Sequence, residues 1–305
     1  MSFKETVNRI KNLKVQGAEN VAIEAVKSLK EVIKESKSKN ISGILADLYH
    51  AKNILFLTRP TEPCMRNALN YVMHELDYDN PIELTKALCL KVDEVLERFD
   101  KNQRIIAQVG SRKIKNGSVV FTHCHSSTIL KILKEAKKQG KRFEVHNTET
   151  RPLYQGRVTA KEVAKLGIPV THFVDAAARF ALKKADLMLI GADAITTEGK
   201  IINKIGSELY AEIANKYDIP VYACTDSWKF DTETIFGYEE EIEGRKGKEI
   251  WKNPPKGVTV DNFAFEKVSP DLITGIISEL GIYKPHIFIQ EIRNNNKWMF
   301  KKHLF

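Results

Sequence analysis

Residues 118–128 read Ser-Val-Val-Phe-Thr-His-Cys-His-Ser-Ser-Thr, an apolar run that leads into a thiol and then three hydroxyl groups. Residues 187–193 read Leu-Met-Leu-Ile-Gly-Ala-Asp, a second apolar run that ends on a carboxyl group. Both runs predict buried strands. Because ligands of open parallel sheets bind just beyond the carboxyl ends of the strands, Cys124 and Asp193 are candidates for an acid/base pair at one sheet edge.

Further short apolar runs alternate with helix-like stretches around these two segments. We expect strands at residues 119–121, 143–146, 170–174, 187–190 and 221–223. Helical spacing over residues 128–139 and 208–216 separates some of these strands. This alternation predicts an α/β domain over residues 113–285, in which a parallel sheet carries helices on both faces. The polar residues 229–256 predict a long excursion over the mouth of that sheet.

The first 112 residues predict a helical N-terminal domain. Val21, Ala25, Leu29 and Val32 recur at helical spacing. Residues 41–49 and 64–76 show a similar pattern, and the prolines at positions 63 and 81 are placed to open two helices at their first turns. Residues 286–305 form a C-terminal tail, for which packing on a neighbouring subunit and disorder are both open.

The composition indicates a soluble globular protein. The 305 residues are 43% hydrophobic and 29% charged, and the formal net charge is +9. This balance fits an anionic partner such as a phosphorylated metabolite, although a lysine-rich solvated surface explains it equally well. No segment approaches the roughly 20 apolar residues needed to cross a bilayer. The four cysteines form no C-x-x-C pair and the first residues lack a signal-peptide core, so we expect a cytoplasmic protein.

Polar residues follow the other expected strands as well. Arg151 comes after the second strand and is suited to bind phosphate. Asn203 and Lys204 come after the fourth strand, where Lys204 would supply a positive charge. Residues 126–128 place three hydroxyls at a helix start, where free N–H groups bind anions. Capping of the helix by one serine is the alternative explanation.

Several familiar sites are absent from the sequence. There is no G-x-G-x-x-G fingerprint after the first strand and no P-loop, so nothing indicates a dinucleotide or nucleoside triphosphate cofactor. His123 and His125 flank Cys124, but neighbours on a strand point to opposite faces and no third metal ligand is evident. We therefore expect no metal and no cofactor, and we expect one of these histidines to be packed or hydrogen-bonded beside the pocket.

At these residues the chain resembles the family that joins the translation initiation factor 2B alpha, beta and delta subunits with sugar-phosphate aldose–ketose isomerases. The resemblance covers residues 10–283 and rests on motifs at 122–128, 149–152, 191–194, 203–207, 229–231 and 265–270. It implies a Rossmann-like second domain and a conversion of ribose 1,5-bisphosphate to ribulose 1,5-bisphosphate, in a nucleoside and AMP salvage route of archaea that feeds RuBisCO. It also implies a homo-oligomer, either dimer or hexamer, activation by a nucleotide such as AMP, and no nucleic-acid or membrane partner.

The resemblance further implies that Cys124 and Asp193 move protons without metal or nicotinamide. It places substrate contacts on Gln16, Gly17, Ala18, Glu19, Arg59, Ser126, Ser127, Thr128, Asn203, Lys204 and Lys229. Many isomerases of the family have an arginine where this chain has Gln16 and a glycine where it has Glu19. Two alternatives to the bisphosphate reaction are open: methylthioribose 1-phosphate isomerisation, whose substrate needs fewer cations, and a non-catalytic regulatory subunit.

The reaction assigns a role to each member of the pair. Enolisation of an opened sugar needs a base at carbon 2 and an acid at the carbonyl oxygen. We assign Cys124 as the base and Asp193 as the acid. A protonated carboxyl needs a pKa raised by burial, and a thiol base needs a pKa lowered by a helix start or a cation.

Overall fold

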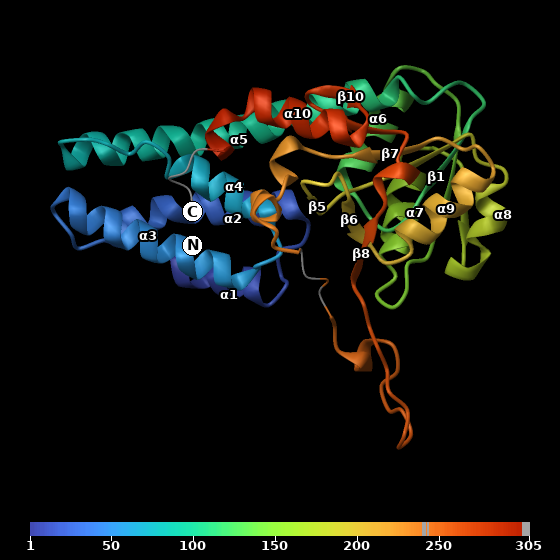
Figure 1. Cartoon of the computed structure of the whole chain (residues 1–305), viewed down its shortest axis with the longest axis horizontal. Coiled ribbons are helices and arrows are strands. Elements are labelled where there is room, and N and C mark those ends of the chain that lie inside the picture. Colours follow the sequence, from blue (N-terminus) through green and yellow to red (C-terminus); the bar gives the residue numbers. More distant parts are fainter. Residues whose placement is uncertain (240–241, 243, 301–305) are drawn as a thin grey trace. The chain divides into compact units, whose positions relative to one another are not determined.

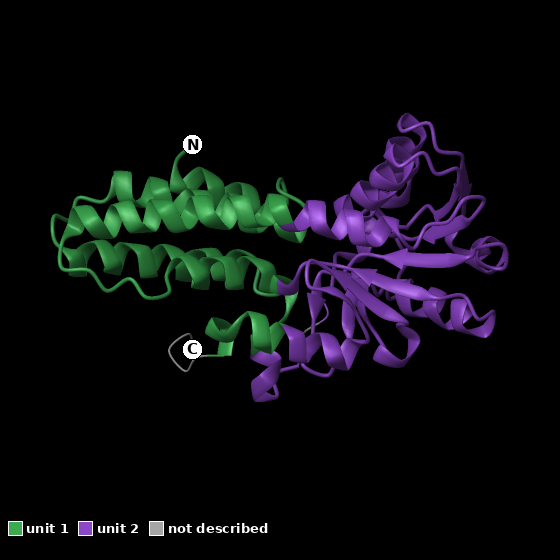
Figure 2. Ribbon diagram, turned by 90° about the horizontal axis from the view of Figure 1, so that it is seen from above, with its two compact units in different colours: residues 1–101, 228–232, 292–305 green, residues 102–227, 233–291 purple. Residues whose placement is uncertain are grey.

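The computed structural model describes residues 1–239, 242 and 244–300 (Figure 1). The chain forms two compact units (Figure 2). Unit 1 contains residues 1–101, residues 228–232 and the chain from residue 292 onward, and unit 2 contains residues 102–227 and 233–291. Each unit therefore joins segments that are distant in sequence. The division of the sequence at residues 112 and 285 stays a prediction.

Unit 1 is helical. Its helices are α1 (Phe3–Lys11), α2 (Ala18–Glu35), α3 (Ile41–Thr58), α4 (Pro63–Val72) and the first part of α5 (Pro81–Ser111). The expected apolar stripe of α2 is buried, with Val21, Ala25 and Leu29 fully inaccessible. Prolines open α4 and α5, as predicted. Burial of these stripes, rather than helix propensity, supplies most of the stability of such a bundle.

The segment of residues 228–232 is held tightly inside unit 1. The side-chain amide of Asn67 donates to the carbonyls of Trp228 and Phe230, both at 2.8 Å. Arg66 forms a buried ion pair with Asp231, with 2.6 Å between Nη2 and Oδ1. These contacts fix the backbone on both sides of Lys229, which is half-buried.

The tail also packs on this segment. It contains the end of α10 (Pro285–Asn295) and the 3-10 turn η6 (Lys297–Phe300). Trp228 Nε1 donates to Asn296 Oδ1 at 3.1 Å, and the rings of Trp228 and Trp298 lie 5.3 Å apart in an edge-to-face arrangement. The described part of the tail is thus ordered and packs within its own chain, which neither expected alternative included. Residues 301–305 lie outside the described residues.

Unit 2 contains a seven-stranded sheet in the order β10-β9-β7-β4-β1-β2-β3. Every pairing in it is parallel except that of β10 with β9. The bounds are β1 (Val119–Thr122), β2 (Glu144–Thr148), β3 (Val170–Phe173), β4 (Leu187–Ile190), β7 (Val221–Cys224), β9 (Gly275–Ser278) and β10 (Gly281–Tyr283). All five expected strands are confirmed. β9 and β10 were not predicted from the sequence.

Helices cover both faces of this sheet, which confirms the α/β fold class. The end of α5 packs with α6 (Ser127–Lys138) and α7 (Gln155–Lys165) on one face, in a core that includes Val120, Val145 and Leu189. On the other face lie α8 (Ala178–Leu182) and α9 (Ser207–Lys216), where the rings of Phe121 and Tyr210 are 5.7 Å apart. Alternate residues of the central strands thus face two different cores, as expected for strands buried on both sides.

The strand order locates the functional edge. From β1 the chain winds outward through β2 to β3 and then returns to the other side of β1 as β4. The direction of winding reverses between β1 and β4, and ligands of doubly wound sheets bind at such a switch point, outside the carboxyl ends of the strands. A second, antiparallel sheet of β5 (Ala194–Ile195), β6 (Ile201–Lys204) and β8 (Phe265–Val268) follows β4 directly. Among the described residues, no helix combines the length and apolarity needed to cross a membrane.

Candidate active site

Cys124 follows β1 at the switch point and has an unusual backbone. Its φ is 64°, in the left-handed region that residues other than glycine seldom adopt. Two threonine hydroxyls hold it there. The Cys124 N–H donates to Thr150 Oγ1 at 3.0 Å, and Thr159 Oγ1 donates to the Cys124 carbonyl at 2.7 Å. Neither threonine was singled out from the sequence, although Thr150 lies in the motif at residues 149–152.

The environment of the thiol keeps its proton on sulfur. Burial raises the pKa of Cys124 to about 11, the Lys204 charge acts in the opposite direction, and the Asp193 carboxylate adds to the increase. This result differs from our expectation that a nearby cation would lower the pKa, because the loss of hydration outweighs the attraction of the ammonium group. The charges of Lys204 and Asp193 thus both act on the Cys124 thiol.

The start of α6 lies at the same edge. Ser126 caps the helix, since its hydroxyl accepts from the N–H of Ile129 at 3.4 Å. A Cβ added to Gly191, the residue that follows β4, would lie 3.1 Å from Ser126 Oγ and 3.8 Å from Asn203 Oδ1. Residues that follow β1 and β4 therefore converge with the end of β6. Of the three predicted hydroxyls, that of Ser127 is exposed, whereas Thr128 is buried and faces Gln103 at 3.5 Å.

Asp193 and Lys204 are positioned by the small antiparallel sheet. The N–H of Asp193 donates to the Ile202 carbonyl at 2.8 Å, which ties the turn after β4 to β6. Lys204 ends β6, is 8% exposed, and places its Nζ 4.4 Å from the ring centroid of Phe265. Asn203 donates to Ser207 Oγ at 2.9 Å at the start of α9. The sheet thus brings the acid and the cation to the edge where Cys124 lies.

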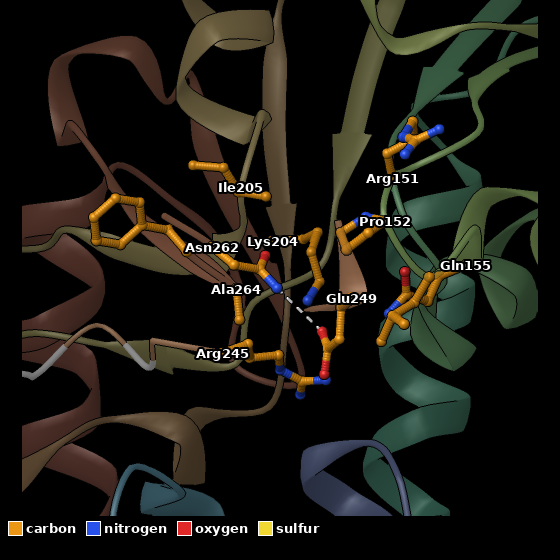
Figure 3. Close-up of a pocket in the computed structure, with 11 residues that line it drawn as sticks. Arg151, Pro152, Gln155, Lys204, Ile205, Arg245, Glu249, Asn262 and Ala264 are labelled. Atoms are coloured by element: carbon orange, nitrogen blue, oxygen red, sulfur yellow. Dashed lines mark hydrogen bonds between the residues drawn. The ribbon is translucent and has the colours of Figure 1, made fainter. Parts of the chain in front are cut away.

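Lys204 also lines a pocket of unit 2 (Figure 3). Figure 3 shows Lys204, Asn262 and Glu249 converging on it, and Asn262 Nδ2 donates to Glu249 Oε2 at 3.2 Å. Two arginines also line the pocket, and one of them is the predicted Arg151. The full lining is Arg151, Pro152, Leu153, Gln155, Lys204, Ile205, Arg245, Glu249, Asn262, Phe263 and Ala264. Part of the predicted excursion, around η4 (Gly247–Glu249), therefore contributes to the pocket. Arg245 was missed, since one arginine in a polar loop carries no signal.

His123 is a packed residue, as expected for one of the two histidines. Its Nε2 donates to the Ile205 carbonyl at 2.8 Å, and its Nδ1 lies 2.6 Å from Thr148 Oγ1. Burial lowers the pKa of His123 to about 4, so the ring is neutral at pH 7. Since Nε2 carries the proton, Nδ1 accepts hydrogen bonds from the neighbouring hydroxyls.

The remaining predicted residues belong to unit 1. Residues 16–19 form the start of α2, where Gly17 has a φ of 85° and no side chain caps the helix. Gln16 is exposed, Ala18 is buried and Glu19 is half-buried. Arg59 directly follows α3 and pairs with Glu62. Contacts of these residues and of Lys229 with a substrate stay a prediction.

The model of the Initiation factor 2 subunit family matches residues 14–285 of the chain. The chain belongs to this family. Within it, the chain is 36% identical to the ribose 1,5-bisphosphate isomerase of Thermococcus kodakarensis, over 97% of this chain and 95% of that protein. It is 32% identical to the methylthioribose-1-phosphate isomerase of Pelotomaculum thermopropionicum, over 93% of this chain and 83% of that protein.

A solved structure supports the same family. The crystal structure described as the Pyrococcus horikoshii OT3 translation initiation factor eIF-2B superposes with a TM-score of 0.81 at 26% identity, over 94% of this chain and 98% of that chain. The expected family and fold are therefore confirmed. The match to the Thermococcus kodakarensis protein extends beyond residue 285, so it includes part of the tail.

Proposed function

We propose that this chain is an aldose–ketose isomerase that converts ribose 1,5-bisphosphate to ribulose 1,5-bisphosphate. The observation that carries the proposal is the placement of Cys124 and Asp193 after neighbouring strands at the switch point, within electrostatic reach of each other and of Lys204. The 36% identity to a ribose 1,5-bisphosphate isomerase over nearly the whole chain supports the choice of substrate. A purely regulatory subunit has no need of the thiol–carboxyl pair.

The first step is opening of the sugar ring. The phosphate occupies the anomeric oxygen, so the bond between carbon 1 and the ring oxygen must break before carbon 2 can lose its proton. The Cys124 thiol gives its proton to the ring oxygen, which takes the electron pair of the broken bond. Carbon 1 becomes an oxocarbenium centre stabilised by its phosphate-bearing oxygen. A protonated thiol suits this step, because burial holds the pKa of Cys124 near 11 in the free protein.

Proton transfer between the two carbons follows. The new thiolate removes the proton on carbon 2, and the electron pair of that bond forms the double bond of an enol phosphate. Asp193 accepts the proton of the hydroxyl on carbon 2 while the thiol protonates carbon 1, which gives the ketone. The proton then returns from Asp193 to sulfur. In this scheme Cys124 is the base at carbon 2, which is the role assigned to it from the sequence. Asp193 takes the proton of the carbon 2 hydroxyl and is the acid toward the carbonyl oxygen in the reverse direction.

Two phosphate groups need several cationic or N–H partners. In unit 2 these are Lys204, Asn203 and the start of α6 with Ser126 and Ser127. Arg59, Lys229 and the start of α2 in unit 1 are proposed as further contacts by resemblance to the family, and the number of cations among the predicted residues favours a bisphosphate. Methylthioribose 1-phosphate is the second candidate, because of the 32% identity to an isomerase of that substrate.

Phosphorus NMR of purified protein with the α-anomer of ribose 1,5-bisphosphate tests the proposal. We expect the signals of ribulose 1,5-bisphosphate to appear with the parent protein and to be absent with Cys124→Ser and Asp193→Asn. Turnover by Cys124→Ser at the parental rate would remove the thiol from the mechanism. No turnover of the bisphosphate, combined with turnover of methylthioribose 1-phosphate, would assign the second candidate.

The wider setting is part of the same proposal. We place the reaction in nucleoside and AMP salvage that supplies RuBisCO, in the cytoplasm, with a homo-oligomer as the active form. AMP is proposed as an activator rather than a substrate. Light scattering during size exclusion gives the oligomer size, and a titration of AMP in the NMR assay tests activation. A monomer with full activity that AMP does not change would contradict both statements.

A further inference from the structure

The backbone of Cys124 needs an explanation beyond the fold. A left-handed φ costs a residue with a side chain on the order of 1 kcal/mol, and such conformations persist only where their surroundings impose them. At Cys124 the surroundings act on both polar groups of the backbone, since Thr150 accepts from its N–H and Thr159 donates to its carbonyl. Both threonines are buried, at 1% and 2% exposure. The peptide groups that carry the thiol are therefore clamped by two side chains from different elements.

Thr150 is itself fixed from two directions. Its own φ is 61°, and its N–H donates to Asp175 Oδ1 at 2.8 Å, while the next N–H, of Arg151, donates to Asp175 Oδ2 at 2.7 Å. Its hydroxyl lies 3.3 Å from His123 Nδ1. The Thr150 hydroxyl shares the one lone pair of that nitrogen with Thr148 Oγ1, which is nearer at 2.6 Å, and it turns its own lone pair toward the Cys124 N–H. The acceptor for Cys124 is thus oriented rather than free to rotate.

Thr159 comes from the first turns of α7, which approaches the end of β2 closely. A Cβ added to Gly156, in the same helix, would lie 1.7 Å from the Thr148 carbonyl oxygen. Only glycine allows this approach, so the position of α7 and of its Thr159 hydroxyl is set by contact with the strand that leads to Thr150. The two halves of the clamp are parts of one rigid arrangement.

We propose that Thr150 and Thr159 are positioning residues for the Cys124 thiol, and that Asp175 sets Thr150. The inference rests on the proposed function for its consequence in catalysis, whereas its structural content concerns Cys124 alone. Without the clamp the left-handed backbone relaxes and the sulfur leaves the line between the ring oxygen and carbon 2. Misplacement of a reacting group by about 1 Å costs on the order of a hundredfold in rate. Neither threonine touches the substrate in this proposal.

The test compares Thr150→Val, Thr150→Ser, Thr159→Val and Asp175→Asn with the parent. Thr150→Val removes the acceptor at nearly constant volume, and Thr150→Ser keeps it. The matched control is Thr274→Val, because Thr274 Oγ1 also accepts a strand N–H, that of Val221 at 3.0 Å, but at the opposite end of the sheet. We expect Thr150→Val and Thr159→Val to lower kcat about tenfold to a hundredfold and to leave KM within about twofold of the parental value. Thr150→Ser should have a kcat close to that of the parent.

A second measurement does not depend on isomerase activity. We expect iodoacetamide at pH 9 to alkylate Cys124 about tenfold faster in Thr150→Val and Thr159→Val than in the parent and in Thr274→Val, since loss of one hydrogen bond of roughly 1–1.5 kcal/mol releases the backbone. Equal alkylation rates in folded parent and variants would overturn the inference whatever the substrate is. A parent without turnover but with the expected alkylation rates would reject the proposed function and keep the clamp. Should Thr150→Val not fold, Thr159→Val and Asp175→Asn decide the question by the same criteria.

Discussion

The protonation of Cys124 leads to a quantitative prediction about its reactivity. The thiolate is the form that iodoacetamide attacks, and burial raises the pKa of the Cys124 thiol from an ordinary value of 9.0 to about 11. Two pKa units correspond to about a hundredfold smaller thiolate fraction at any pH below 9. We therefore expect Cys124 of the folded protein to react about a hundredfold more slowly at pH 8 than the same thiol in the urea-unfolded chain.

The pH profile separates this electrostatic effect from simple steric protection. The alkylation rate of Cys124 is followed by mass spectrometry of its own peptide between pH 7 and pH 11.5, with circular dichroism to verify that the protein stays folded. We expect the rate to rise about tenfold per pH unit and to level off near pH 11. Steric protection alone would lower the rate uniformly and leave the plateau at an ordinary pH.

Lys204→Met provides the internal check. Lys204 is the charge that lowers the pKa of Cys124 against the effect of burial, so its removal moves the profile to still higher pH. A parent profile that levels off at pH 9 or below would refute the reasoning, and so would a Lys204→Met profile displaced toward lower pH. The first result would restore the sequence-based expectation of a thiolate in the free protein, and the second would contradict the influence assigned to Lys204.

Other predictions concern the surroundings of the site. Burial holds the pKa of His123 near 4 against an ordinary 6.5, so the unfolded chain takes up the proton at a higher pH than the folded protein. The free energy of unfolding should therefore fall by roughly 3 kcal/mol in all as the pH falls from 6.5 to 4. Urea unfolding should show this loss in the parent but not in His123→Gln. Gly156→Ala should lower the thermal midpoint by at least several degrees, because its Cβ would collide with the Thr148 carbonyl, whereas Gly244→Ala, whose Cβ meets nothing within 4 Å, should leave it within about two degrees. Trp298→Ala removes rings packed on Tyr71 and Trp228, and it should cost about 3 kcal/mol by urea unfolding; a value under about 1 kcal/mol would contradict the role assigned to the tail.

The sequence predicts the strands that form long apolar runs and not those that depend on distant partners. Leu187–Ile190 is apolar at every position and is fully buried, so β4 was predicted with its bounds. β5 has only two residues, and β6 ends in Asn203 and Lys204, so a pattern search assigns both to loops. β5 exists because it pairs with β6, and β6 because it also pairs with β8, about 65 residues further along the chain. Such pairing leaves no periodic signal in either segment.

The site shows the same division. The edge that holds Cys124 and Asp193 followed from where apolar runs end, because the carboxyl ends of parallel strands meet at one edge. The direction of the pKa shift of Cys124 could not be predicted from the sequence, because it depends on how much water the packed loops exclude. The cation that the sequence suggested, Lys204, has a weaker influence on this pKa than burial has. Thr150 and Thr159 could not be identified either, because a threonine has the same appearance in a sequence whether its hydroxyl meets solvent or a strained backbone.

The family contains proteins described as isomerases and proteins described as translation factors on one fold, so the fold alone does not decide the activity and the side chains at the sheet edge have to be considered. In this chain the groups at that edge are coupled in a definite way. Burial keeps the proton on sulfur, and Lys204 is the charge that opposes it. A phosphate group bound at Lys204 would offset that charge, so the thiol would hold its proton more firmly in the complex than in the free protein. In the proposed mechanism the thiol therefore enters the reaction as an acid and becomes a base only after it has opened the ring. The reactive thiolate would then exist only in the interval in which the proton on carbon 2 is acidic.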